Sequence, residues 1–146
     1  MKHKNFKNGF SITEITVVIG IVAVLAAFGV SSFRNAKHSS ALRDGEAIVL
    51  HALERARSRA QSGVLNTKHG VVINEKEVIS FEGDSYLGGG NTHTLPFVVS
   101  TDQVGTEIVF SRISGEPNTG AVITLTNILG ETGEIEITGN GSINLN

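Results

Sequence analysis

The chain has 146 residues, which is enough for one modest globular domain behind a long helix, and its lack of cysteine excludes a disulfide-stapled fold. Its 17 glycines favour a sheet with many tight turns. Charge is uneven: residues 34–59 hold six basic and three acidic side chains, whereas residues 68–146 hold three basic and ten acidic ones. This pattern fits ordinary solubility charge, or a basic helix that faces acids of neighbouring subunits.

The first nine residues are short, polar and basic. Lys2, Lys4 and Lys7 are their only charged side chains. Positive charge before an apolar stretch keeps the N-terminus in the cytoplasm and sends the following chain across the membrane.

The next segment is a long apolar run with one acid at its start. The nineteen residues 15–33, between Glu14 and Arg34, carry no charge. As a helix they would measure about 29 Å, close to the thickness of a bilayer core. A charged side chain at mid-membrane costs roughly 2.5–3.5 kcal/mol on insertion scales, so Glu14 is expected either to find a cationic partner or to reach the lipid headgroups.

Two simpler interpretations of this run are a secretory signal peptide cut near residues 23–27 and an uncut signal anchor. An ordinary signal peptide has no acid at the head of its apolar region. The apolar pattern also continues past the alanines. Both observations weigh against the two interpretations.

The segment resembles the class III leader of type IV pilins and type II secretion pseudopilins. The resemblance rests on a basic leader ending in Gly9, a following Phe10, a Glu at position 14 and a long apolar helix. It implies that a prepilin peptidase cuts after Gly9 on the cytoplasmic side and methylates the new amine of Phe10. A cation at Phe10 and an anion at Glu14 could pair within one helix or across two packed helices. The resemblance implies the second arrangement, in which Glu14 of one subunit meets the Phe10 amine of a neighbour. An α-amino group with a pKa near 7.7–8.0 is mostly cationic at neutral pH, as such a pair requires.

Beyond Phe33 the helical pattern becomes amphipathic. Small and apolar residues recur at three- and four-residue steps between Leu42 and Ala60, and Gly63 is a plausible C-cap. The sequence therefore predicts one helix from Phe10 to about Ser62, roughly 80 Å long.

The remainder is expected to form short antiparallel strands, because alternating apolar residues are separated by turn residues. Asn140-Gly141 lies between two such segments and is a strong hairpin signal. The expected strands cover residues 70–73, 78–81, 95–99, 106–110, 121–125, 135–137 and 142–145.

Residues 83–94 are predicted to be a mobile loop, because they are rich in glycine. The oxygen ligands of Glu82, Asp84 and Ser85 suit calcium, although a solvated loop is the simpler interpretation. Asn140-Gly141-Ser142 fits the glycosylation triplet, but its hairpin role accounts for it.

No catalytic constellation is present. The five histidines are scattered without metal-ligand spacing, and there is no nucleophile elbow or phosphate-binding loop. The sequence predicts neither an enzyme nor a cofactor or metal site.

Residues 53–60 resemble the end of the long helix in minor pilins and pseudopilins of the GspH/FimT type. The resemblance implies a pilin-like α+β fold, in which a long N-terminal α-helix is membrane-spanning in its apolar half, amphipathic in its second half, and packed on antiparallel β-sheets. The expected parts are a cleaved leader (1–9), an apolar assembly helix (10–33), an amphipathic helix (34–62) and an exported β-rich domain (63–146).

The predicted function is that of a non-enzymatic minor subunit of a type IV pilus or type II secretion pseudopilus. It would be anchored in the inner membrane with its C-terminal domain exported. Expected partners are other pilin subunits, prepilin peptidase, the assembly platform and the lipid bilayer. The alternatives are a DNA-uptake receptor or adhesin at a pilus tip, and an anchored domain that never polymerises. The acidic C-terminal part argues against nucleic acid, because DNA binding needs exposed bases.

Overall fold

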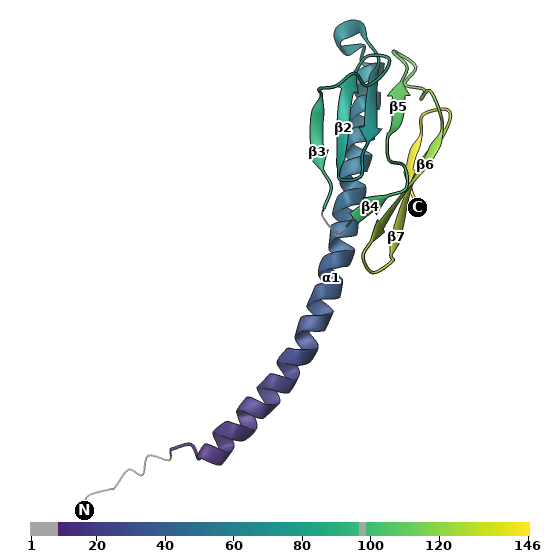
Figure 1. The fold of residues 1–146 in the computed structure, drawn as a ribbon. Coiled ribbons are helices and arrows are strands. Elements are labelled where there is room, and N and C mark those ends of the chain that lie inside the picture. Colours follow the sequence, from purple (N-terminus) through teal and green to yellow (C-terminus); the bar gives the residue numbers. More distant parts are fainter. Residues whose placement is uncertain (1–8, 97–98) are drawn as a thin grey trace, which may run out of the picture. The chain divides into compact units, whose positions relative to one another are not determined.

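The computed structural model describes residues 9–96 and 99–146 (Figure 1). Residues 1–8 of the predicted leader, which spans residues 1–9, lie outside this part of the chain. Two units can be distinguished by their internal contacts, and the second begins at Lys37. Each unit is described by itself below.

One helix, α1 (Ile12–Gln61), extends over 50 residues of the N-terminal part of the chain. Its end is a tight turn at Gly63, whose N–H donates to the carbonyl of Ala60 at 3.2 Å. Gly63 has φ 65°, a left-handed conformation that glycine adopts without steric cost. The predicted continuous helix and its glycine cap are both confirmed. A short 3₁₀ turn, η1 (Val64–Asn66), follows.

Two antiparallel sheets, each of four strands, make up the rest of the second unit. The first sheet has the order β3-β2-β1-β5, and the second has the order β4-β6-β7-β8. The strands of the first sheet are β1 (His69–Ile73), β2 (Glu77–Glu82), β3 (Asn91–Thr94) and β5 (Thr106–Phe110). Those of the second are β4 (Val99–Thr101), β6 (Ala121–Asn127), β7 (Thr132–Ile137) and β8 (Ile143–Leu145).

Six of the predicted strands are confirmed, with ends that differ by up to three residues. The β1–β2 hairpin closes where the Asn74 N–H donates to the carbonyl of Glu77 at 2.8 Å. The β7–β8 hairpin uses the predicted Asn140-Gly141 turn, and the Gly141 N–H donates to the carbonyl of Thr138 at 2.8 Å.

The predicted loop over residues 83–94 is wrong in its last four residues. Asn91–Thr94 form β3, which pairs with β2 from Ser80↔Asn91 to Glu77↔Thr94. This strand lies at the edge of its sheet and is mostly exposed. It therefore lacks the apolar alternation by which half-buried strands are identified.

The strand predicted for residues 95–99 is also displaced. Of the described residues in this region, Val99 is the first one that pairs in a sheet. It begins β4, which pairs with β6. Pro96 has no N–H to donate to a ladder, and Leu95 is buried while its N–H bonds the carbonyl of Lys76 at 2.8 Å. Leu95 thus anchors the connection between the two sheets.

The main hydrophobic core lies between the second half of α1 and both sheets. From α1 come Leu42, Val49, Leu53 and the small residues Ala52, Ala56 and Ala60. The alanines lie at four-residue spacing, which lets the helix approach the sheets closely. The sheets contribute Val71, Ile73, Val78, Ile108, Phe110, Val99, Ile123, Leu125, Ile135 and Ile137.

A second, smaller cluster covers the opposite face of the first sheet. It consists of Val72, Ile79, Phe81 and Val109, with Tyr86 packed against it. Tyr86 belongs to the glycine-rich segment between β2 and β3, and its backbone N–H donates to the carboxylate of Glu107 at 3.1 Å. Strand β1 is therefore buried on both faces.

Candidate functional site

The predicted cleavage junction lies just outside the helix. Gly9 and Phe10 precede the first residue of α1, and Phe10 is 79% exposed. The carbonyl of Ser11 accepts the first helical bond, from Ile15 N–H at 3.2 Å. The peptide bond between Gly9 and Phe10 is thus in non-helical, solvent-exposed chain.

Glu14 lies in the first turn of α1 and is exposed. A carboxylate at this position is favoured by the positive end of the helix dipole. In the described part of the chain, no cationic side chain forms an ion pair with it. Its carboxylate is therefore left to solvent in the described part of the chain.

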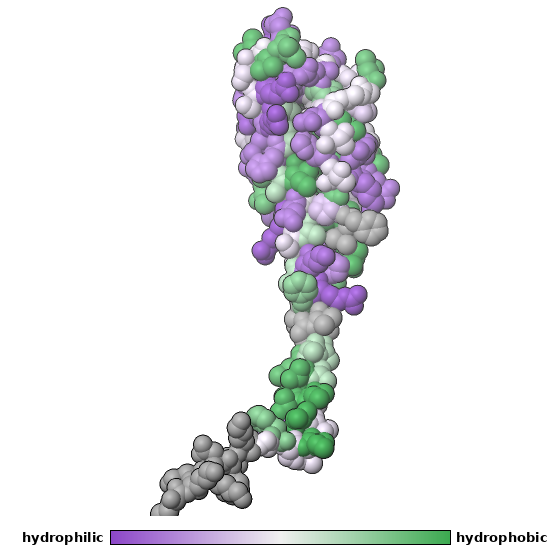
Figure 2. Space-filling model, turned by 90° about the vertical axis from the view of Figure 1, so that its left-hand side faces the viewer, coloured by the Kyte–Doolittle hydropathy of each residue, from purple (hydrophilic) through white to green (hydrophobic). Residues whose placement is uncertain are grey.

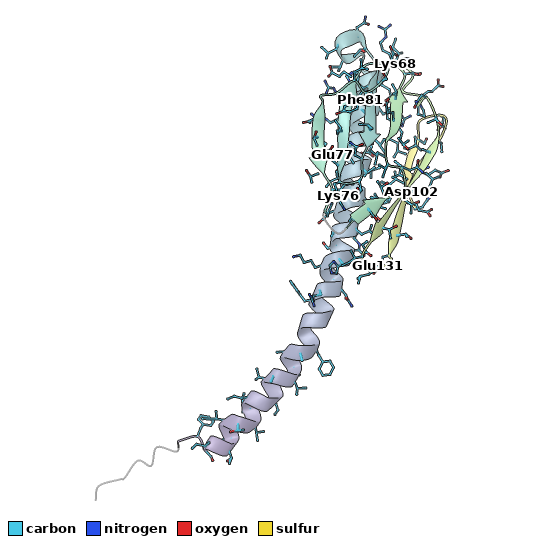
Figure 3. The ribbon with its side chains drawn as sticks, viewed as in Figure 1. Lys68, Lys76, Glu77, Phe81, Asp102 and Glu131 are labelled. Atoms are coloured by element: carbon cyan, nitrogen blue, oxygen red, sulfur yellow. The ribbon has the colours of Figure 1, made fainter. Side chains whose placement is uncertain are left out.

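An uncovered apolar surface extends along the chain on both sides of Glu14. It consists of Phe10, just before the helix, and the first half of α1, which is coloured green in Figure 2 and drawn with its side chains in Figure 3. Its large apolar side chains are 49–84% exposed: Phe10, Ile12, Ile15, Val17, Val18, Ile19, Ile21, Val22, Val24, Leu25, Phe28 and Phe33. By length and composition, α1 is the one helix among the described residues that could cross a membrane. This surface requires lipid or other protein around it.

The candidate calcium ligands are engaged with cations of the chain itself. The Glu82 carboxylate accepts from Arg59 at 2.8 Å, and the Asp84 carboxylate lies 2.7 Å from Lys68 Nζ. Across the described residues, no group of three or more His, Asp or Glu side chains could hold a metal ion.

The three arginines near the end of α1 have different surroundings. Arg59 is bound to Glu82, and Arg57 points to the β7–β8 turn, where its Nη2 donates to the carbonyl of Asn140 at 3.5 Å. Arg55 is exposed and has no hydrogen bond or ion pair with the described residues. The three do not form one exposed basic stripe of the kind that binds phosphates.

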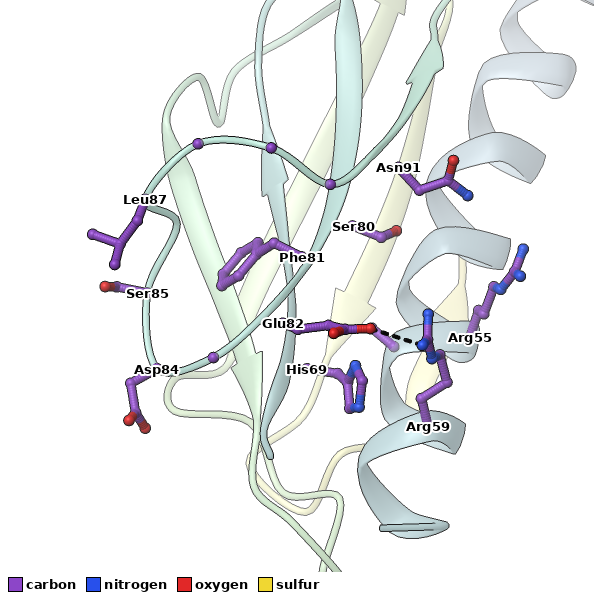
Figure 4. Close-up of a pocket in the computed structure, with 15 residues that line it drawn as sticks. Arg55, Arg59, His69, Ser80, Phe81, Glu82, Asp84, Ser85, Leu87 and Asn91 are labelled. Atoms are coloured by element: carbon purple, nitrogen blue, oxygen red, sulfur yellow. Dashed lines mark hydrogen bonds and ion pairs between the residues drawn. The ribbon is translucent and has the colours of Figure 1, made fainter. Parts of the chain in front are cut away.

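Sequence reasoning missed a cavity of about 600 Å³ beside Arg55 (Figure 4). Residues of α1, of β1 and β2, and of the segment between β2 and β3 line it. Its polar groups come from positions as far apart as Arg55, Ser80 and Asn91. No linear motif joins them, so only the tertiary fold brings them together.

A polar link that no sequence motif indicates joins α1 to the turn after β6. The Ser39 hydroxyl donates to the Glu131 carboxylate at 2.8 Å, and the Asn127 amide donates to the same oxygen at 2.7 Å. These two hydrogen bonds, Ser39 first, lower the pKa of Glu131, and the positive charges of Arg43 and His38 act in the same direction. This site holds the helix and the sheet together.

Comparisons with known proteins were made by sequence and by structure. No family model matches the sequence. No curated protein matches it either. Among solved structures, the fold is similar to that of the minor pseudopilin EpsH from the type 2 secretion system of Vibrio cholerae, with a TM-score of 0.55 and 15% sequence identity. The match covers 72% of this chain and 95% of that chain.

A match at 15% identity shows a similar fold. This fold agrees with the architecture of the two sheets and the helix. A long N-terminal helix is followed by two antiparallel sheets, and the second half of the helix packs on both. The chain therefore has the pilin-like α+β fold of a pseudopilin.

Proposed function

We propose that this protein is a non-enzymatic structural subunit, a minor pilin or pseudopilin, of a type IV pilus or type II secretion pseudopilus. The observation that carries the proposal is the combination of a pilin-like domain with an exposed apolar half-helix that bears one carboxylate, Glu14, in its first turn. A domain that acted alone in water would leave this surface uncovered. A subunit that enters a helical fibre uses it first in the membrane and then against other helices.

The proposal includes processing at the junction before the helix. A prepilin peptidase would remove residues 1–9 and methylate the amine of Phe10. The exposed, non-helical chain at Gly9 and Phe10 supports this step, because a peptidase must bind its substrate in an accessible, extended form. The precursor would be anchored in the inner membrane with its C-terminal domain exported, next to the platform that assembles the fibre.

In the assembled fibre, Glu14 would pair with the Phe10 amine of a neighbouring subunit. An isolated charge among apolar helices is heavily penalised, so this pair can fix the axial register of the subunits. The absence of a cationic partner for Glu14 among the residues that the structure describes is consistent with an intermolecular contact.

Replacement of Glu14 by Val tests this assignment in cells that hold the peptidase and the assembly machinery. The variant should be inserted and shortened normally, yet its amount in sheared or cross-linked fibres should fall at least about tenfold, because one charge-assisted contact per subunit is lost. The measurement is the ratio of fibre-bound to membrane-bound protein on immunoblots.

Thr16→Val is the matched control, because Thr16 is exposed on the same apolar half-helix and its hydroxyl bonds only the helix's own Ile12 carbonyl at 2.9 Å. It should assemble like the wild type. Equal incorporation of Glu14→Val and Thr16→Val would overturn the role of Glu14. Absence of the wild-type chain itself from fibres would favour an anchored domain that does not polymerise.

A further inference from the structure

The cavity beside Arg55 lies where the first sheet is incomplete. Strand β3 pairs with β2 only as far as Ser80↔Asn91. The last two residues of β2, Phe81 and Glu82, therefore have no β3 partner, although both pair with β1. The chain between β2 and β3 passes around this gap instead of filling it, and the cavity of about 600 Å³ remains between this segment, the edge of β2 and α1.

The segment that encloses the gap is held by specific contacts. Asp84 is paired with Lys68, the Tyr86 N–H is bound to Glu107, and the Tyr86 ring packs on Phe81 with centroids 5.6 Å apart. At its end, Gly90 has φ 122°, and a Cβ there would lie 2.5 Å from the carbonyl oxygen of Ser80. Glycine thus allows the segment to return close to β2 and form the wall of the cavity.

Three polar side chains of the cavity face the same space between β2 and α1. Ser80 lies two residues from the core residue Val78, so it points to the face of the sheet that packs on α1, and Asn91 is its pairing partner on that face. Arg55 comes from α1 opposite them, as Figure 4 shows. All three can donate hydrogen bonds.

None of these three groups is satisfied within the described chain. The Ser80 hydroxyl oxygen is buried and has no hydrogen-bond partner there. A buried polar group without a partner carries a desolvation cost. The Arg55 guanidinium forms no ion pair with the described residues, whereas its neighbour Arg59 is neutralised by Glu82.

The charges of the cavity indicate which ligand fits. Arg59 is balanced by Glu82, and Asp84 is balanced by Lys68, so Arg55 is the one uncompensated charge of the lining. One positive charge beside a hydroxyl and an amide matches one carboxylate, which accepts several hydrogen bonds in one plane. A phosphate or a nucleic-acid backbone would bring more negative charge close to Glu82 and Asp84.

We propose that this cavity binds the carboxylate of an acidic side chain presented by a neighbouring subunit, held by Arg55, Ser80 and Asn91. The inference rests on the proposed function only in requiring that subunits pack together. Charge complementarity selects the partner: residues 68–146 of this chain carry ten acids and three bases, so a second domain of this kind displays an excess of carboxylates. Exposed examples are Glu116 and Glu134.

This binding can be measured by isothermal titration calorimetry. The full chain, purified in detergent micelles, would be titrated with a blocked hexaglutamate peptide at physiological salt. A blocked hexaglutamine peptide is the uncharged control. A saturable heat of binding is expected with hexaglutamate and none with hexaglutamine.

Two variants locate the binding. Arg55→Gln should raise the dissociation constant of hexaglutamate about tenfold or more, whereas Arg34→Gln, an exposed arginine on the same helix and outside the cavity, should leave it unchanged. Ser80→Ala should also weaken binding but should not lower the thermal unfolding midpoint, because its hydroxyl has no partner to lose within the described fold. A purely structural role for Ser80 would lower the midpoint and leave binding unchanged.

Equal affinity of the Arg55→Gln and Arg34→Gln variants for hexaglutamate would overturn the proposal. So would free glutarate that binds as tightly as the peptide, since the occupant would then be a dissolved carboxylate and not a protein chain. The assay uses single solubilised subunits, so it depends neither on cleavage after Gly9 nor on fibre assembly. A negative result in this assay would not contradict the proposed function. A negative result in the Glu14 test would not contradict the binding of a carboxylate in this cavity.

Discussion

Gly70 shows how one residue determines the packing of the outer face of the first sheet. It pairs with Phe81 on one side and with Val109 on the other. A Cβ at this position would lie 2.5 Å from Cζ of Phe81 and 3.0 Å from the carbonyl oxygen of Ile108. The ring of Phe81 therefore lies directly over the glycine, and this contact supports the segment that carries Tyr86.

Gly70→Ala should lower the free energy of unfolding by about 1–3 kcal/mol, because the methyl group overpacks a buried contact with ring and backbone atoms. Urea unfolding of the full chain in detergent measures the change. The control is Gly139→Ala, where a Cβ would meet nothing within 4 Å and the expected change is within about 0.5 kcal/mol. If the Gly70 variant were as stable as this control, the described packing of Phe81 would be wrong.

At the scale of elements, the link between α1 and the turn after β6 is polar, and it joins the exposed Glu131 (labelled in Figure 3) to the buried Asn127. Asn127 organises the turn, because its side-chain oxygen accepts the N–H groups of Leu129 at 2.9 Å and Glu131 at 3.1 Å. Its amide then joins the Ser39 hydroxyl at the Glu131 carboxylate. The ionised form of Glu131 is the acceptor that both donors need.

This link predicts a stability that depends on pH. The folded state lowers the pKa of Glu131 below its ordinary value of 4.5, chiefly through the hydrogen bond from Ser39. A lowered pKa contributes stability that is fully present above the ordinary value and is lost as the pH falls through the lowered one. The urea midpoint should therefore decrease on acidification from pH 4.5 downward.

Glu131→Gln should remove part of this decrease, because an amide does not titrate in that range. Glu134→Gln, an exposed glutamate on β7, is the matched control and should keep the wild-type profile. Identical pH profiles for the Glu131 variant and the wild type would show that this link does not stabilise the fold.

The elements that sequence reasoning predicted well are those with a strong periodic pattern. Helix α1, its Gly63 cap and the Asn140-Gly141 hairpin each follow from local preferences that tertiary packing reinforces. The missed strand β3 is polar and lies at a sheet edge, so its pairing with β2 has no trace in hydrophobic alternation. Because Asn91 was assigned to a loop, the cavity that it lines could not be predicted either.

The cleavage and assembly motif and the cavity beside Arg55 also differ in how far the sequence could predict them. Gly9, Phe10 and Glu14 form a linear motif, so their roles could be predicted from sequence and remain predictions about processing and assembly. Arg55 and Ser80 lie on α1 and β2, and only the packing of these elements makes them neighbours of one cavity.

At the scale of the whole molecule, the apolar side chains serve two different purposes. The buried ones, which start at Leu42, pack into a core that the second unit completes by itself. Those of residues 10–33 are largely exposed where the structure describes their side chains, so folding of their own chain does not bury them. The exposed half-helix therefore specifies an environment outside the chain, which is lipid before assembly and neighbouring helices afterwards under the proposed function.

The central claim is that this chain is processed before it enters a fibre. Its most direct test is mass spectrometry of the N-terminal peptide of the protein isolated from cells that express the full chain with a prepilin peptidase. The account predicts a mature chain that starts at Phe10 with a methylated amine, and a precursor mass for a Gly9→Val variant. Assembled protein that still carries the residues before Phe10 would contradict it.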